Sequence, residues 1–162
     1  MSLISDPIDV GFESYASVAE ADDILAARGQ DAKWKCLTTI NKEIQLRLAT
    51  EYADNRYGFI GNRASTVQPL EWPRTSISRY TSAEIPDILK KGVAVLAAES
   101  IDLELYSTVS LQTGAIKSTM DKLDVITTRV DYYQGGSSSG QVSFTEVNKI
   151  LRSLTTTGLG RA

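Results

Sequence analysis

The sequence predicts a mainly α protein: a small bundle of about four helices with a β-hairpin arm, a long central loop and a flexible C-terminal tail. Several stretches carry helix-start signals or apolar residues at helical spacing. One later stretch changes to strand-like alternation with many β-branched residues. The length of 162 residues and the hydrophobic content of 42% suit a single globular domain.

The first helix is expected at about residues 18–28. Ser17-Val-Ala-Glu20 has the pattern of a capping box, in which the side chains of Ser17 and Glu20 satisfy backbone N–H groups at the start of a helix. Gly29 follows the last apolar residue and supplies a left-handed stop.

The second helix is expected at about residues 32–53, because apolar residues recur there at three-, four- and seven-residue steps. The predicted buried stripe consists of Trp34, Leu37, Ile44, Leu48 and Tyr52. Cys36 lies inside this helix and is expected to be a small buried or half-buried side chain, since no basic partner that would activate it is visible.

The third helix opens at Ile85-Pro86-Asp87 and continues to about residue 105 as the central core helix. Proline is tolerated in a first helical turn and an acid favours its positive end. Gly92 and its small neighbours permit close helix–helix approach. The fourth helix opens with a second capping box, Ser143-Phe-Thr-Glu146, and has one short apolar face.

Two strands, at residues 116–120 and 124–132, form the predicted hairpin of residues 116–132. The expected domain organisation is a helical core with this hairpin over residues 1–134, a Gly/Ser linker over 135–142, and a C-terminal helix and tail over 143–162. From Thr155 onward the tail has no core-forming pattern and should be free in a monomer.

A long connection spans residues 55–84, and connections of this length are often functional. Trp72 and Pro73 are expected to anchor it on the helices, as Trp34 anchors the second helix. Gly58-Phe-Ile-Gly61 lacks the ending of a phosphate-binding loop, so two tight turns around a buried Phe59 are favoured.

Charge is unevenly distributed although the net charge is only −3. Residues 1–31 hold seven acids and one base, whereas residues 55–80 hold four arginines and one acid. The two segments are expected to pair, either within one subunit or between neighbouring subunits. The residues named for these contacts are Asp22, Asp23, Arg56, Arg63, Arg74 and Arg79.

The composition excludes several chemistries. There is no His and only one Cys, which excludes a Ser-His-Asp triad, an imidazole metal site, a thiolate zinc cluster and an intrachain disulfide. No spacing suggests a pair of catalytic carboxylates, so no enzymatic activity, metal or cofactor is expected. No segment is a membrane span or a signal peptide, which favours a cytoplasmic product.

Bases and aromatic rings alternate along the central loop, an arrangement that suits stacking of single-stranded nucleic acid. The residues are Arg56, Tyr57, Phe59, Arg63, Trp72, Arg74, Arg79 and Tyr80. A surface loop anchored by its aromatic residues and paired with acids is favoured over this alternative, because the bases are few and the whole chain is acidic.

Five motifs in a fixed order carry a resemblance to a known family: Tyr15-Ala-Ser-Val-Ala-Glu-Ala-Asp22, Trp34, Ala49-Thr50-Glu-Tyr52, Leu70-Glu-Trp-Pro-Arg74 and Ile85-Pro86. From about residue 8 to residue 154, the chain resembles the head-to-tail adaptor (head completion) proteins of tailed bacteriophages, whose relatives are often labelled DnaT-like ssDNA-binding proteins. Those relatives often have a shorter loop after the hairpin than the Gly/Ser stretch found here.

The resemblance implies a structural virion protein, made in the host bacterial cytoplasm, that forms a dodecameric ring between the portal protein and the tail or nozzle protein. DNA would pass through the ring without sequence-specific binding and without contact with a membrane. The implied portal-binding residues are Leu154, Thr155, Thr156, Thr157, Leu159, Arg161 and Ala162. The implied hairpin contacts with a neighbouring adaptor or the tail are Ile116, Lys117, Arg129 and Tyr132. The alternative is a single-stranded-DNA-binding replication accessory protein.

Overall fold

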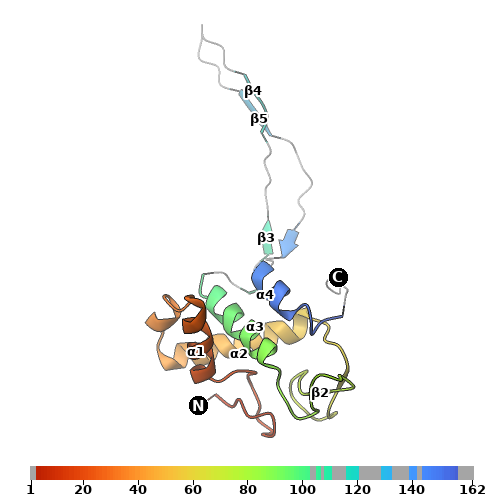
Figure 1. Ribbon diagram of the computed structural model, residues 1–162. Coiled ribbons are helices and arrows are strands. Elements are labelled where there is room, and N and C mark those ends of the chain that lie inside the picture. Colours follow the sequence, from red (N-terminus) through yellow and green to blue (C-terminus); the bar gives the residue numbers. More distant parts are fainter. Residues whose placement is uncertain are drawn as a thin grey trace. The chain divides into compact units, whose positions relative to one another are not determined.

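A computed structural model describes most of the chain (Figure 1). The described residues are 3–102, 105–106, 108–110, 116–120, 129–132, 139–141 and 144–156. The chain forms two compact units: a helical unit, residues 1–105 with 144–162, and a strand unit, residues 106–143. The described residues hold four α-helices and an antiparallel hairpin, which confirms the predicted fold class.

Helix α1, Val18–Arg28, has the predicted bounds. The Ser17 hydroxyl accepts from the Glu20 backbone N–H at 3.2 Å, and the Glu20 carboxylate accepts from the Ser17 N–H at 2.8 Å. Gly29 closes the helix with a φ of 65°, in the left-handed region where glycine is favoured. The capping box and the stop are therefore confirmed.

Helix α2, Thr39–Arg56, starts later than predicted, because a short 3₁₀ turn, η1 (Trp34–Cys36), precedes it. Thr38 caps α2 and accepts from the Asn41 N–H, so residues 34–37 do not continue its helical phase. The buried side chains of α2 are Leu46, Ala49, Thr50, Tyr52 and Ala53. The predicted stripe is thus wrong at Ile44 and Leu48, which lie on the exposed side, and right at Trp34 and Tyr52.

Cys36 is exposed, contrary to the sequence expectation. It ends η1 instead of lying within a long helix, and its thiol donates to the Ala32 carbonyl at 3.4 Å. The break between the 3₁₀ turn and α2 turns this position away from the core.

Helix α3, Asp87–Glu99, packs against α1, α2 and α4 and is the central helix of the helical unit, as predicted. Figure 1 shows it in green between α4 and α2. The helix is shorter than expected, with Pro86 at its N-cap and Ser100 at its C-cap. Gly92 lies directly against Leu151, which confirms its role in close approach.

Helix α4, Thr145–Leu151, packs on α3 and buries Val147 and Leu151. The predicted second capping box depends on Ser143; in the described residues Phe144 is the N-cap, and the Glu146 carboxylate accepts from Arg28 and from the Gln30 amide. Ser143 lies outside the described residues. Helix α4 thus belongs to the same unit as the other helices, even though the strand unit separates it from them in sequence.

The strand unit contains two antiparallel pairs. Strand β4, Ile116–Met120, pairs with β5, Arg129–Tyr132, which confirms the hairpin; residues 124–128, predicted to begin its second strand, lie outside the described residues. Strand β3, Thr108–Ser110, pairs with β6, Ser139–Gln141. Residues 139–141 of the predicted linker over 135–142 thus take part in backbone pairing, which glycine and serine do not prevent.

The connection between α2 and α3 folds around Trp72, which is completely buried and makes edge-on contacts with Phe59 and Tyr80. The expectations that Trp72 anchors this loop and that Phe59 is buried are confirmed. Two short strands, β1 (Asn62–Arg63) and β2 (Arg74–Thr75), pair within the loop, and the Trp72–Pro73 peptide bond is cis.

Candidate functional site

The basic central loop does not present the surface that its sequence suggested. Arg74 is only 8% exposed and holds the loop together from inside. Its guanidinium donates to the backbone carbonyls of Ile60 at 2.9 Å and Gly61 at 2.7 Å, and it pairs with the Glu71 carboxylate. Because Arg74 is buried and makes these contacts within the loop, it is not available to a neighbouring subunit or to a phosphate. Its prediction as a residue that contacts another subunit is therefore corrected.

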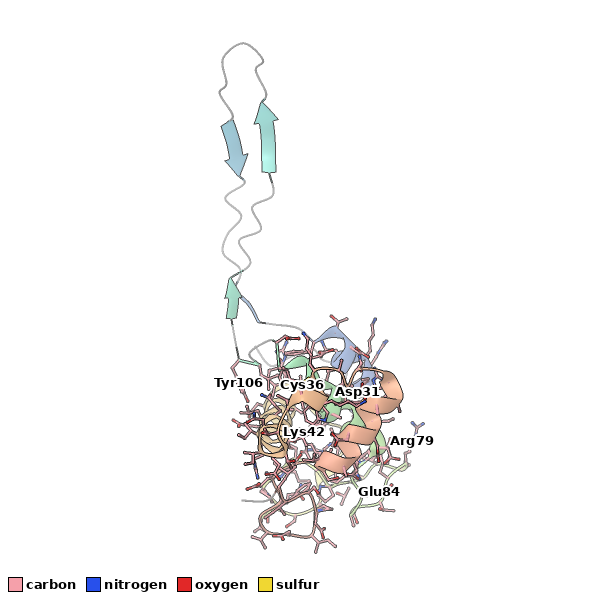
Figure 2. All side chains as sticks on the ribbon, turned by 90° about the vertical axis from the view of Figure 1, so that its left-hand side faces the viewer. Asp31, Cys36, Lys42, Arg79, Glu84 and Tyr106 are labelled. Carbon is pink, nitrogen blue, oxygen red and sulfur yellow. The ribbon has the colours of Figure 1, made fainter. Side chains whose placement is uncertain are left out.

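Two of the aromatic rings of the loop are also withdrawn from the surface, whereas Tyr57 and Tyr80 are half-buried. Phe59 and Trp72 are buried, and neither offers a face on which a base stacks. Arg63 donates to the Gln68 carbonyl, within its own loop, and lies 4.0 Å from the Glu71 carboxylate. Of the loop cations, Arg79 is exposed without an ion pair in the described structure, and Figure 2 shows it at the outer edge of the helical unit.

The acidic N-terminal segment does not pair with the loop within the described part of the chain. Asp22 accepts from the Trp34 indole at 2.5 Å and from Lys42 at 2.8 Å, both outside the loop. Its acidic neighbours Glu13 and Glu20 pair with Arg47 of α2 and Lys90 of α3. These acids thus stabilise the bundle itself, and Asp23 is the predicted contact acid that stays exposed.

The start of the predicted docking tail is part of the fold. Leu154 is buried, and its carbonyl accepts from the Ile60 N–H at 2.9 Å. Thr155 forms a β-bridge with Phe59, and the Thr156 N–H donates to the Gly58 carbonyl at 2.8 Å. The expectation of a chain free from Thr155 onward is therefore wrong at Thr155 and Thr156.

The remaining predicted contact residues lie outside the described residues or on the strand unit. Thr157, Leu159, Arg161 and Ala162 lie outside the described residues. Ile116 and Lys117 lie on β4, and Arg129 and Tyr132 lie on β5.

Three described cations lie next in sequence to, or within a turn of, residues that join α2 to α4, namely Arg56 at the last position of α2, Lys149 on α4 and Arg152 just after α4. We call these three residues the α2–α4 basic surface. Lys149 and Arg152 are exposed and Arg56 is partly exposed. In the helical unit, the described cations outside any ion pair are Arg56, Arg79, Lys91, Lys149 and Arg152.

Three contacts bring these two helix ends together. The Tyr57 hydroxyl donates to the Asn148 side-chain oxygen at 2.6 Å, and Tyr52 meets Phe144 edge-on with ring centroids 5.6 Å apart. In the third contact, the Gly58 carbonyl accepts from the backbone N–H and the hydroxyl of Thr156. Figure 1 shows the end of α2, in yellow, beside the blue chain of α4.

The electrostatics of this surface favour anions. Burial raises the pKa of the Tyr57 hydroxyl well above its ordinary value, so Tyr57 stays protonated and neutral at physiological pH and adds no negative charge. The nearest acid on α4, Glu146, is already engaged by Arg28. Arg56, Lys149 and Arg152 form no ion pair within the described residues, although the negative charge of Glu99 also acts on Tyr57.

No described helix combines the length and the apolar character that crossing a bilayer requires. In the same part of the chain, Asp, Glu and Cys side chains do not gather in threes around a possible metal position.

The fold and its surface define a small helical protein with an inserted strand unit and a localised patch of unpaired cations. A family model described as "Putative DnaT-like ssDNA binding protein" matches residues 1–162. Because the match covers the whole chain, the protein belongs to this family. The match gives no evidence for the head-to-tail adaptor family that the sequence was thought to resemble.

No curated protein and no solved structure matches the chain.

Part of the α2–α4 basic surface was within reach of sequence analysis. Lys149 and Arg152 lie three residues apart, on the side of α4 away from the buried Val147 and Leu151, which indicates an exposed basic face. Arg56 is 93 residues away from Lys149 in the sequence, so only tertiary packing places it there.

Proposed function

We propose that this protein binds single-stranded nucleic acid at the α2–α4 basic surface, through the phosphate backbone and without catalysis. The observation that carries the proposal is the gathering of Arg56, Lys149 and Arg152 on adjoining helix ends, each outside any ion pair of the described residues. Most other described cations of the helical unit are engaged by carboxylates. The DnaT-like family to which the chain belongs supports the same class of ligand.

The physical basis is the release of counterions from the strand. Each cation that neutralises a phosphate of a single strand contributes about 0.7 to the slope of log affinity against log salt. Three cations give a slope of about 2, so affinity should fall roughly fifteenfold between about 50 and 200 mM salt. Since Phe59 and Trp72 are buried and Tyr57 and Tyr80 are half-buried, stacking should contribute little and sequence preference should be weak.

The test measures anisotropy of a fluorescent oligothymidylate at both salt concentrations. The double variant Lys149→Glu/Arg152→Glu should lose at least about tenfold in affinity at low salt and most of the salt dependence. Both side chains are exposed, so the fold should be unaffected.

Arg79→Glu is the matched control, because Arg79 is also exposed and also lacks an ion pair among the described residues, but belongs to the central loop. It should change affinity by about twofold or less, an effect of net charge alone. An equal loss in the control and the double variant, or no binding by the wild type at low salt, would reject the proposed surface.

A second candidate function is the head-to-tail adaptor ring of a virion, with the portal above it and a tail or nozzle protein below it. The observation that favours it is the anchoring of Leu154, Thr155 and Thr156 on residues 58–60, which fixes where the C-terminal segment leaves the helical unit. Since these three residues are engaged within the fold, portal contacts would fall to Thr157, Leu159, Arg161 and Ala162.

Deletion of residues 157–162 tests this candidate. The truncated protein should fold normally but no longer co-sediment with portal rings. Co-sedimentation equal to that of the full chain would reject it. The two candidates also differ without a mutation, because the ring function predicts no useful affinity for oligonucleotides at physiological salt.

A further inference from the structure

The outward side of α2 carries a stripe of aliphatic side chains. Ile40, Ile44 and Leu48 are 69%, 44% and 39% exposed, and their four-residue spacing aligns them on one side of the helix. The core-facing side of α2 is occupied by other residues, from Leu46 to Ala53. We call these three residues the α2 stripe.

The α2 stripe is not needed for packing of the helical unit. Single exposed aliphatic residues are common on protein surfaces, but an aligned set on the side of a helix opposite its core indicates a contact with another molecule. Its centre is Ile44, with one aliphatic neighbour a turn away in each direction, so the stripe is nearly symmetric about that residue.

We propose that the α2 stripe docks on the same stripe of a second copy of this chain, with the two α2 helices antiparallel and a two-fold axis at Ile44. In this arrangement Ile44 meets its own counterpart and Ile40 meets Leu48 in both directions. Rows of residues four apart are the ridges that interdigitate in the commonest class of helix packing. The interface is isologous, so it closes at a dimer.

Charge complementarity favours a second copy of this chain as the partner, with its α2 helix running antiparallel. Glu51 is exposed on the same side of α2, about 10 Å beyond Ile44 along the axis, and has no ion pair within the described residues. In the antiparallel pair it faces the start of the other α2. The free backbone N–H groups there carry positive charge; the exposed Lys33 and Lys35 that precede α2 are already paired with Asp102 and Asp31 and add little.

The parallel alternative is disfavoured by the same residues. Two parallel helices in register would place Glu51 against Glu51 and one positive helix start against the other. The one unpaired charge on this face is therefore attractive only when the second copy runs in the opposite direction.

The small size of the stripe sets the strength of the association. Three aliphatic side chains per copy cover much less than the roughly 800 Å² per partner of a standard interface. The dimer should therefore be weak and concentration-dependent, with a dissociation constant in the range of about 10 μM to 1 mM.

Sedimentation equilibrium of the full chain, up to about 1 mM, tests the association. The wild type should show a monomer–dimer equilibrium, and Ile44→Glu should raise the dissociation constant at least about tenfold, because two carboxylates would meet at the axis. Val67→Glu is the matched control, since Val67 is 87% exposed and lies outside the stripe; it should leave the equilibrium unchanged. A wild type that stays monomeric, or equal effects of both variants, would overturn the proposal.

Oxidative cross-linking tests the geometry independently of affinity. In a Cys36→Ser background, Ile44→Cys should form a disulfide-linked dimer. Glu51→Cys should not, because two residues 51 lie about 20 Å apart in the antiparallel pair. A cross-link at position 51, with or without one at 44, would indicate a parallel pair, and higher oligomers without a cross-link at 44 would indicate a ring; both results contradict the proposal.

The inference does not depend on the proposed nucleic-acid binding. The α2 stripe and the α2–α4 basic surface share no residue, so Ile44→Glu should leave oligonucleotide affinity at low protein concentration unchanged. Loss of either property alone identifies which proposal has failed.

Discussion

Asp54 places a carboxylate against the loop that surrounds Trp72. The Tyr15 hydroxyl and the Glu71 backbone N–H donate to its two oxygens, the latter at 3.0 Å, and the Trp72 N–H in turn donates to the Tyr15 oxygen at 3.1 Å. Burial raises the pKa of Asp54 to about 6, although both hydrogen bonds act to lower it. A single side chain of α2 thus links the N-terminal segment to the central loop at the cost of a desolvated charge.

This shift predicts the pH dependence of stability. Because the pKa of Asp54 is higher in the folded than in the unfolded chain, the folded state binds the extra proton. The contribution of Asp54 to the free energy of unfolding is therefore greatest below about pH 4 and falls as the pH rises through 6, by at most about 3 kcal/mol. In urea unfolding across this pH range, the free energy of unfolding of the wild type should fall with rising pH, and that of Asp54→Asn should lack this contribution.

Glu20 should give a pH dependence of stability with the opposite sign and therefore serves as a control. Its partial burial alone would raise its pKa, but hydrogen bonds from Lys90 and Ser17 outweigh this and lower it. Its contribution is present above the unfolded pKa and is lost as the pH falls through the folded value, so Glu20→Gln should change the slope in the other direction. Parallel stability curves for the wild type and Asp54→Asn would contradict the assignment to Asp54.

The contact between α3 and α4 depends on one residue without a side chain. A Cβ atom added to Gly92 would lie 2.5 Å from Leu151 Cδ2 and 2.9 Å from its Cγ. Leu151 is buried, so it has little room to move aside. The small residue at this position therefore determines how closely the C-terminal helix approaches the central one.

Gly92→Ala should destabilise the protein by about 1–3 kcal/mol, the usual range for overpacking of a core. The sign is informative, because the same change inside an unhindered helix stabilises it by about 1 kcal/mol. Urea unfolding gives the free energy directly.

A double-mutant cycle with Leu151→Ala tests the cause. In that background the added methyl group meets no side chain, so Gly92→Ala should cost nothing further or should stabilise the helix. Additive losses would show that the clash with Leu151 is not the reason.

At the level of the whole molecule, the two units differ in how they are stabilised. The helical unit has a buried core that includes both Trp34 and Trp72. The strand unit shows two-stranded pairs in its described residues, and such pairs are marginal on their own in water. The units should therefore open independently.

Hydrogen exchange measures this difference. Amides of β3 and β6 should exchange at least about a hundredfold faster than those of the buried positions of α3, because their opening does not require unfolding of the helical core. Tryptophan fluorescence during urea unfolding reports on the helical unit alone and serves as the reference. Equal protection in both units would show that they unfold as one cooperative body.

The sequence by itself determined what depends on neighbouring residues. Helix α1 has the predicted bounds because its start and stop signals, Ser17, Glu20 and Gly29, act over a few positions. The core of α3 and the strand Ile116–Met120 follow equally from local periodicity. Local signals did not predict that Glu146 also pairs with a distant cation, Arg28.

Only the tertiary structure decided which surfaces remain available. Arg74 was expected to contact another subunit, but the loop folds around it as well as around its predicted anchor Trp72 and buries both. Ile44 and Leu48 looked like core residues, but a cap at Thr38 shifts the phase of α2 and leaves them exposed. Burial and charge pairing are properties of contacts between segments far apart in the chain, and the joining of Arg56 with α4 is set by those contacts alone.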